Sequence, residues 1–298
     1  MEDLGHGRSG TDGRSKREQR VFRVHCWGVR GSLPVSGPEF QRYGGNTFCV
    51  EVRCGDRRLL FDAGSGLLPA SRALLGEGVK SFDLFFTHSH YDHIVGLPFF
   101  LPIYIPDTNV RIWAGHLDGK MTTRDMMDSF IRPPWFPVRM DMCRSHLEFQ
   151  DFIAGDSLDV MPGLTIKTKL LNHPGGATGY RLEWQGRTLA IITDTEHVPG
   201  APLDPNVLEL IDRADLFLYD CMYIDSEMEK HKGFGHSTWQ QAVRLAQAAG
   251  AGKVGFVHHS PLRTDAEIDE IGRQAAEVMS GAFPIPDGMT LDMLEDMA

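Results

Sequence analysis

Three histidines and one aspartate fall within six consecutive positions of the stretch "FFTHSHYDHIVGL", residues 85–97. The runs on either side, "FDLFF" and "IVGLPFF", are apolar and aromatic, which indicates that both are buried. The polar cluster is therefore predicted to lie on the loop where a strand ends. Loops that rigid elements hold in place commonly carry a protein's chemistry, so the fold must bring a buried strand to the edge of a site.

Short strand-like runs recur along the chain, and three more of them end in a residue that can bind metal. "LTIKTKLLNH" ends at His173, "RTLAIITD" ends at Asp194 and "KVGFVH" ends at His258. Several runs are continuously apolar, as strands buried on both faces of a sheet tend to be. "GYRLEWQGRTLAIITD" is predicted to be a hairpin that turns at Gln185-Gly186.

Two helices are predicted from their ends. Ser237 is a good N-cap for a helix with apolar residues at helical spacing over 239–249, and Gly250 supplies a stop. Thr264 with Glu267 resembles a capping box at the start of a second helix. Strands mixed with helices along one chain predict a layered α/β architecture.

The chain of 298 residues is expected to form one large domain behind a tail. Residues 1–20 are polar and glycine-rich and are predicted to be a disordered tail rather than a signal peptide. Residues 21–298 are expected to form a single domain. Within it, residues 96–163 fit the pattern least well, because the prolines of "SFIRPPWFPV" break regular elements. We expect residues 96–163 to be an insertion that acts as a lid or as a homodimer contact.

Two roles are open for four aromatic side chains of this insertion. They either give the apolar surface of a small-molecule pocket beside a polar site, or they fill the core beneath the insertion. The four residues are Trp113, Phe130, Trp135 and Phe136.

The composition of the chain limits the kinds of molecule that it is expected to bind. The net charge is −10, from 30 basic and 40 acidic residues, so a long nucleic acid is an unlikely partner, although a metal site could bind a small anion. No apolar run approaches the roughly 20 residues that a membrane helix needs. Five scattered cysteines without a CxxC pair predict neither a disulfide framework nor a thiolate zinc site. A reduced, cytoplasmic protein is expected.

The spacing within the histidine cluster predicts two metal ions rather than one. Residues two apart in an extended loop point the same way, so His88 and His90 can share one ion. Asp92 and His93 then turn toward a second position, because one tetrahedral ion cannot take all four and keep an open site. The distant strand ends would supply the remaining ligands. Such sites accept Zn²⁺, Mn²⁺ or Fe²⁺, with zinc expected first.

"THSHYDH" resembles the HxHxDH signature of the metallo-β-lactamase superfamily, and "FDAG" resembles its early aspartate motif through Asp62. The resemblance runs from about Val21 to the C-terminus. It implies an α/β fold, the four-layer αββα sandwich, with two divalent metal ions in a cleft between the sheets.

The same resemblance implies a ligand set. His88, His90 and His173 would bind the first metal. Asp92, His93 and His258 would bind the second metal. Asp194 would bridge the two, and His259 is the alternative to His258.

A further stretch, "FGHSTWQQAVRLAQAAGAGKVGFVHHSP", resembles ribonuclease Z and its phosphodiesterase relatives. His236 matches the histidine that assists phosphodiester cleavage there. Asp220, in "LYDCMY", stands where those enzymes usually have a glutamate. With Asp92, these two are the implied catalytic residues. Ribonuclease Z has a long arm between its third and fourth motifs, but His173 and Asp194 are only 21 residues apart, which argues against tRNA as substrate.

The predicted function is therefore a binuclear metallohydrolase that cleaves a small anionic phosphodiester. A 3′,5′-cyclic nucleotide is the first expectation, attacked by a hydroxide that two metals generate between them. The alternatives are a thiolester or lactam-type hydrolase and a ribonuclease Z-like RNA endonuclease.

Overall fold

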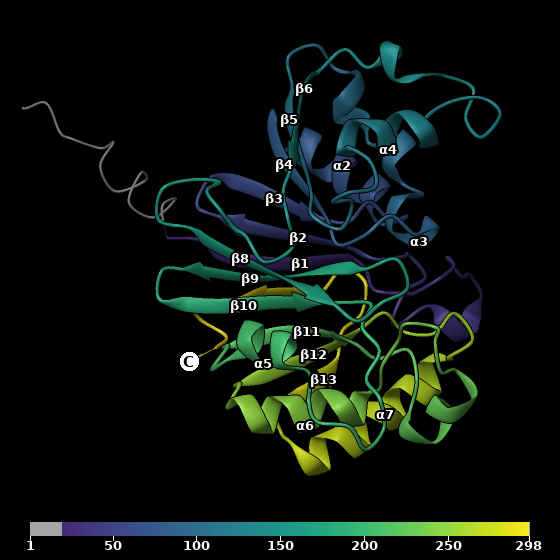
Figure 1. The fold of residues 1–298 in the computed structure, drawn as a ribbon, viewed down its shortest axis with the longest axis vertical. Helices are drawn as coiled ribbons and strands as arrows, with labels where there is room; N and C mark the ends of the chain where they lie inside the picture. Colours follow the sequence, from purple (N-terminus) through teal and green to yellow (C-terminus); the bar gives the residue numbers. More distant parts are fainter. Residues whose placement is uncertain (1–19, 298) are drawn as a thin grey trace, which may run out of the picture.

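The computed structural model describes residues 20–297, so the expected tail lies almost wholly outside the described residues. Two seven-stranded mixed sheets lie face to face, with helices on their outer faces (Figure 1). This arrangement is the predicted four-layer αββα fold. None of the helices among these residues is long and apolar enough to cross a bilayer.

The first sheet has the strand order β14-β1-β2-β3-β4-β5-β6. Strands β3 to β6 run parallel to one another, whereas β1 pairs antiparallel with both β14 and β2, and β2 pairs antiparallel with β3. The strands are β1 (Phe22–Gly28), β2 (Cys49–Cys54), β3 (Arg57–Phe61), β4 (Ser81–Phe86), β5 (Asn109–Ala114), β6 (His146–Asp151) and β14 (Thr290–Asp292).

The second sheet has the order β13-β12-β11-β10-β9-β8-β7. Strands β10 to β13 are parallel, and β9 runs antiparallel to both β8 and β10. The strands are β7 (Ser157–Leu158), β8 (Thr165–Leu171), β9 (Ala177–Trp184), β10 (Arg187–Ile192), β11 (Leu216–Asp220), β12 (Lys253–Val257) and β13 (Ala282–Pro284).

Helices cover the outer face of each sheet (Figure 1). Those on the first sheet are α2 (Leu67–Gly76), α3 (Tyr91–Ile94) and α4 (Thr123–Phe130). Those on the second sheet are α5 (Pro205–Ile211), α6 (Trp239–Ala249) and α7 (Asp265–Val278). Short 3₁₀ turns are η1 (Pro38–Phe40), η2 (Leu97–Phe99), η3 (Leu101–Tyr104), η4 (Met140–Met142) and η5 (Asp225–Lys230).

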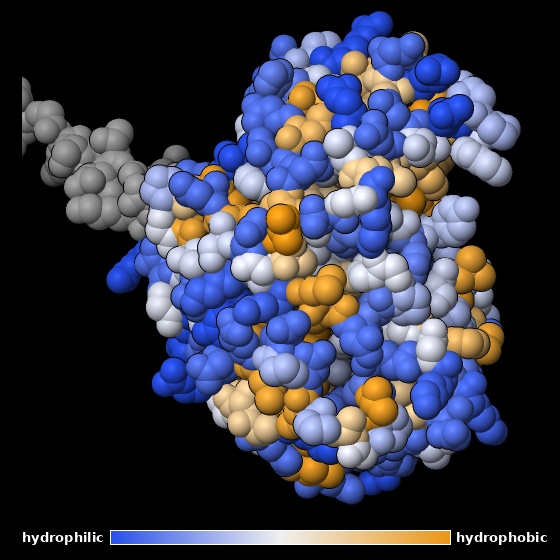
Figure 2. Space-filling view, viewed as in Figure 1, coloured by the Kyte–Doolittle hydropathy of each residue, from blue (hydrophilic) through white to orange (hydrophobic). Residues whose placement is uncertain are grey.

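Strand β4 shows why apolar residues occupy both faces of its run. Phe82, Leu84 and Phe86 face the helices on the outer side of the first sheet. Phe85 faces the opposite way, into the core between the sheets. Both faces of the strand are thus buried. The outer surface is different: on the face seen in Figure 2, apolar side chains form small separate groups among polar ones, as is normal for a globular protein.

The predicted hairpin turn and the predicted capping box of α7 are confirmed, whereas the N-cap of α6 lies one residue later than predicted. Gln185 (φ 53°) and Gly186 (φ 76°) form the turn between β9 and β10, because a two-residue hairpin turn favours positive φ at both positions. Helix α7 begins with the predicted capping box at Thr264. Helix α6 is capped by Thr238 instead of Ser237, because the Ser237 hydroxyl is engaged by His197 and Tyr219.

Residues 96–163 differ in part from the expected insertion. They contribute β5 and β6 to the first sheet and β7 to the second. Three of their segments are therefore strands of the two sheets and not part of an insertion. Only residues 115–145, which include α4, make a long excursion between two adjacent strands. The strand signal of β6 is weak because this edge strand is only half-buried and carries mostly polar residues.

The strand directions fix the position of a site. Strand β8 runs in the same direction as β10, because both pair antiparallel with β9. The carboxyl ends of β8, β10, β11 and β12 therefore lie at one edge of the second sheet. The loop after β4, which carries "THSHYDH", meets this edge: the backbone N–H of Thr178, in β9, donates to Thr87 O at 2.8 Å.

Phe85 should be essential to the packing between the sheets. Its ring stacks on Phe61 (centroids 5.0 Å apart) and on Trp113 (5.5 Å), and it is fully buried. We expect Phe85→Ala to lower the free energy of unfolding by about 3–5 kcal/mol, because the cavity left behind adds to the lost burial. Denaturant unfolding measures this, with the exposed Val278→Ala as control. A change below about 0.5 kcal/mol, typical of surface positions, would contradict the packing described.

Candidate metal centre

Three histidines meet at the edge of the two sheets. The Nε2 atom of His88 lies 3.0 Å from Nδ1 of His90, and Nε2 of His173 lies 3.0 Å from the same atom. His88 and His90 come from the loop after β4, and His173 follows β8 of the other sheet. Two nitrogen ligands of a tetrahedral zinc ion, each about 2.0–2.1 Å from it, are about 3.3 Å apart. The three nitrogens thus have nearly the spacing that one ion requires.

A second group of donors lies beside the first. Oδ2 of Asp92 lies 3.2 Å from Nε2 of His93 and 3.1 Å from Nε2 of His258. The two imidazole nitrogens are 3.2 Å apart. This group also spans the cleft, because His258 follows β12 of the second sheet.

Asp194 lies between the two groups, with one oxygen toward each. Its Oδ1 is 3.7 Å from Nε2 of His88 and 3.9 Å from Nε2 of His173. Its Oδ2 is 3.2 Å from Nε2 of His93 and 3.3 Å from Nε2 of His258. A carboxylate in this position can contact two cations at once.

The charges in the cleft call for a cation. Asp62, Asp92, Asp194 and Asp220 are all buried, and within residues 20–297 none forms an ion pair with a lysine or arginine. Buried charges are normally paired or coordinate a metal. Burial alone would raise the pKa of Asp194, but neighbouring imidazoles, His258 first, hold it well below its usual value. Asp194 therefore remains charged, and the donor set fits divalent metal ions.

The imidazoles of the first group suit the same purpose. Burial lowers the pKa of His173, and it lowers that of His88 well below the usual range. A neutral imidazole offers a lone pair to a metal. The three converging nitrogens can thus act as ligands without first losing a proton at neutral pH.

Three residues at this site have a strained backbone conformation. Asp62, Asp194 and His258 have φ of 61°, 55° and 58°, in the left-handed region where residues other than glycine are uncommon. Each lies within two residues of the end of its strand. Such a conformation costs on the order of 1–3 kcal/mol and persists where the surroundings enforce it. Three of these residues at one site indicate that the fold is held in this geometry for function.

A second layer of hydrogen bonds orients the imidazoles. Oδ2 of Asp62 lies 2.7 Å from Nδ1 of His93, while Asp62 also accepts from the backbone N–H and hydroxyl of Thr87. The carbonyl of Gly235 accepts from Nδ1 of His173 at 2.8 Å. Contacts of this kind fix which ring nitrogen faces the metal.

His236 lies beside the two donor groups, in a further cluster with Asp194, Asp220 and His258. Its Nδ1 is 2.9 Å from Oδ2 of Asp220 and 3.7 Å from Oδ1 of Asp194. Its ring stacks on that of His258, with centroids 4.9 Å apart. Burial would lower the pKa of His236, but the Asp220 carboxylate raises it to about 9. Although the side chain of Asp220 is one methylene group shorter than that of a glutamate, its carboxylate contacts His236 directly.

The remaining residues singled out in the sequence divide between site and core. His259 points away from the cluster, with Nε2 3.2 Å from the Ile285 carbonyl. Trp113 lies in the core between the sheets, and Phe136 packs against the helix-side core of the first sheet. Phe130 and Trp135 line a cavity next to the site.

A cavity of about 290 Å³ opens over the donor groups. Ser32, Tyr91 and Phe234 contribute to it beside the histidines and aspartates, and the backbone N–H of Ser32 donates to Oδ2 of Asp92 at 2.7 Å. These three residues were not predicted. For Phe234 a signal existed in its position within "FGHST", two residues before His236.

The sequence reasoning also missed Glu196. Its carboxylate accepts the backbone N–H of Gly233 at 2.9 Å and that of Gly235 at 2.8 Å. Gly235 has φ +86°, and a Cβ there would lie 2.2 Å from Nδ1 of His173. Glu196 therefore holds the loop that supports His173 and precedes His236. A lone glutamate after "ITDT" gave no signal of this role.

Comparison with known proteins gives the family. A family model described as a beta-lactamase superfamily domain matches residues 57–259. Ribonuclease Z of Haloarcula marismortui is 26% identical, over 90% of this chain and 96% of the relative. The superfamily resemblance and its ribonuclease Z and phosphodiesterase branch are thereby confirmed.

Two solved structures share the fold. The metallo-β-lactamase fold protein YhfI from Bacillus subtilis superposes with a TM-score of 0.68 at 18% identity, over 91% of this chain and 98% of that one. A diphosphatase of the PhnP family superposes with a TM-score of 0.64 at 20% identity, over 91% and 97%.

We expect Glu196→Ala to weaken metal retention by about 10-fold, the low end of the effect of losing a direct outer partner of a metal ligand, because Glu196 reaches His173 only through Gly235. The reason is that the Gly233–Gly235 loop loses its only side-chain acceptor among the described residues. Competition against a chelator measures the affinity, and Glu209→Ala, an exposed glutamate paired with Lys169, is the control. Equal retention in both variants and the parent would contradict the role given to Glu196.

Proposed function

This chain belongs to the β-lactamase superfamily, as a hydrolase of the metallo-β-lactamase type, and from that premise we propose that it is a phosphodiesterase for small phosphodiesters. One observation carries the proposal. His236, held by Asp220, lies against Asp194 and His258 of the donor set, in a cluster of four that also includes Asp220. A hydrolase of thiolesters or lactams would use the same donors and would not need this histidine.

The donors fit two divalent ions, with zinc first and manganese or iron next. His88, His90 and His173 would hold one ion. Asp92, His93 and His258 would hold the other. Asp194 would contact both. When bound, the ions would act as Lewis acids that lower the pKa of a water molecule and neutralise charge on a phosphate.

The chain's own residues supply orientation and proton transfer. With Nδ1 bound to Asp220, His236 keeps its Nε2 free of hydrogen bonds within residues 20–297. That atom can donate a proton to the leaving oxygen or a hydrogen bond to the charged phosphate. Asp92, fixed by the Ser32 N–H, can orient the attacking water. Asp220 acts through His236 by holding its ring.

The size of the site favours a small substrate, and a 3′,5′-cyclic nucleotide is our first choice. The 290 Å³ cavity over the donors is at the small end for ligand pockets. Between His173 and Asp194 the chain forms only the β9–β10 hairpin and its approaches, and the net charge is −10. Both features weigh against many phosphate contacts.

RNA is nevertheless the main alternative. The sequence relative named above is a ribonuclease Z, which stands against the expectation that a long nucleic acid is unlikely. The PhnP-family structure is named a diphosphatase and is closer to the small-substrate proposal. We further propose a reducing compartment such as the cytoplasm, since all five cysteines are free. A homodimer remains part of the proposal.

A substrate panel tests the reaction class. Metal-loaded protein is assayed with bis(p-nitrophenyl) phosphate, 3′,5′-cyclic nucleotides, a thiolester, a β-lactam and precursor tRNA. We expect phosphodiesters to be turned over far better than the thiolester or the lactam. Efficient 3′-end cleavage of precursor tRNA would move the function to the RNA alternative, and turnover of the thiolester alone would overturn the proposal.

We expect His236→Ala to lower kcat on bis(p-nitrophenyl) phosphate by about 10²–10⁴-fold, the usual worth of general acid–base participation. KM should change little, because the interaction develops in the transition state. His146→Ala, at an exposed histidine of β6, is the control. Full activity in His236→Ala would remove His236 from the mechanism.

A further inference from the structure

A second cavity, of about 320 Å³, adjoins the one over the metal donors. The two cavities share Ser89 and Tyr91, so a molecule bound at the donors can extend into the second cavity. Its walls are Ser89, Tyr91, Ile94, Met121, Met126, Ser129, Phe130 and Trp135.

The lining of this second cavity has no charged side chain. Tyr91 and Trp135 are 78% and 75% exposed, which is unusual for large aromatic side chains. The hydroxyls of Ser89 and Ser129 form no hydrogen bond with any described residue. The cavity therefore offers flat apolar faces together with two free hydrogen-bonding groups.

Trp135 is held in place by its neighbours. The backbone N–H groups of Trp135 and Phe136 both donate to the Arg132 carbonyl, at 3.0 and 2.9 Å. Phe136 packs against the core and meets Phe99 edge-on at 5.6 Å. The turn is thus anchored on one side of Trp135, while the indole ring itself remains exposed at the cavity.

We propose that Tyr91 and Trp135 form a subsite for the aromatic base of a nucleotide substrate. This inference rests on the proposed phosphodiesterase function, because the phosphate must lie at the metal donors for the base to reach the second cavity. Every base has a π-face that can stack on an aromatic side chain. The serine hydroxyls can bond to the polar edge of a base, whereas an alkyl chain would leave them unpaired.

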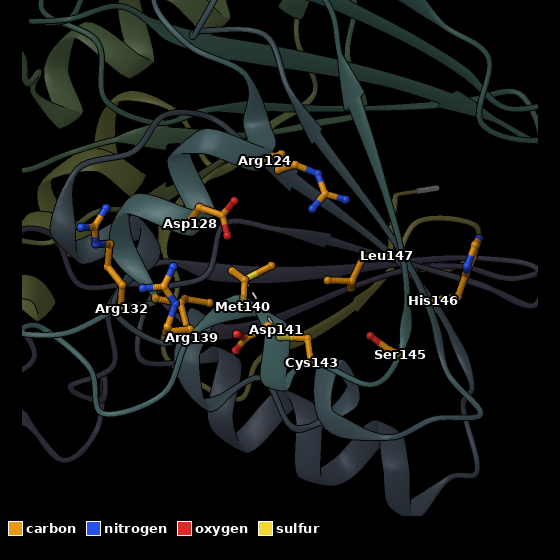
Figure 3. Close-up of a pocket in the computed structure, with 11 residues that line it drawn as sticks. Arg124, Asp128, Arg132, Arg139, Met140, Asp141, Cys143, Ser145, His146 and Leu147 are labelled. Carbon is orange, nitrogen blue, oxygen red and sulfur yellow. Dashed lines mark hydrogen bonds between the residues drawn. The ribbon is translucent and has the colours of Figure 1, made fainter.

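A larger cavity of about 530 Å³ lies elsewhere and supports no such role. It faces Arg124 and Asp128, on the side of α4 opposite to Met126 and Ser129. Arginines and aspartates are mixed around it (Figure 3). It shares no lining residue with the cavity over the metal donors.

The test compares two ligands that differ only in the base. Adenosine 5′-monophosphate and ribose 5-phosphate are titrated calorimetrically into the metal-loaded full chain. We expect the nucleotide to bind roughly 5- to 100-fold more tightly, the usual worth of stacking one base. Trp135→Ala and Trp135→Leu should lose most of this preference, whereas Trp135→Phe should retain most of it. Leu262→Ala, at an exposed apolar residue that lines neither cavity, should keep the preference.

Each contrary outcome has one meaning. Equal binding of the two ligands, or a preference that survives Trp135→Leu, would overturn the subsite while phosphodiesterase activity on bis(p-nitrophenyl) phosphate remained. Conversion of a dimer to a monomer by Trp135→Ala, with the ligand preference intact, would assign the cavity to a chain-to-chain contact instead. Failure to hydrolyse any phosphodiester would overturn the proposed function, and the subsite with it.

Discussion

The carboxylate of Asp194 faces imidazoles on both sides, and the rest of the site is built around it. Each of its oxygens lies within 4 Å of one histidine from each sheet, and Oδ1 also lies 3.7 Å from His236. A buried carboxylate normally pairs with a cation. Among the described residues, no lysine or arginine forms an ion pair with Asp194. Divalent cations would neutralise it together with Asp92. The stability of this edge of the molecule is therefore expected to depend on metal.

The sandwich makes this arrangement possible. The two sheets bring the loop after β4 against the carboxyl ends of β8, β10 and β12, and the apolar core behind them fixes the strand ends. Left-handed residues at Asp62, Asp194 and His258 cost free energy that this packing must offset. Function thus resides in the strand ends, while the core supplies the rigidity that keeps the donors together.

The parts of the site that could be predicted have local signals. His88, His90, Asp92 and His93 fall within six consecutive positions, and a dense group of side chains that can bind metal is recognisable in a sequence. His173, Asp194 and His258 each end an apolar run, so a sheet edge could be expected to collect them. The αββα fold followed from the superfamily resemblance.

Other features of the site and the fold depend on contacts between residues far apart in the chain, and the local sequence does not indicate them. Glu196 acts on backbone N–H groups of Gly233 and Gly235, which any acceptor could satisfy. The cap of α6 moved to Thr238 because distant side chains engage Ser237. The edge strand β6 lacks an apolar run, so its membership of the sheet was hidden within the expected insertion.

The central claim is that Asp194 joins two metal positions, and diffraction locates them most directly. Crystals of zinc-loaded protein would be measured above and below the zinc absorption edge. The account predicts two anomalous peaks, one among His88, His90 and His173 and one among Asp92, His93 and His258, with an Asp194 oxygen beside each. A single peak, or peaks that Asp194 does not contact, would contradict it.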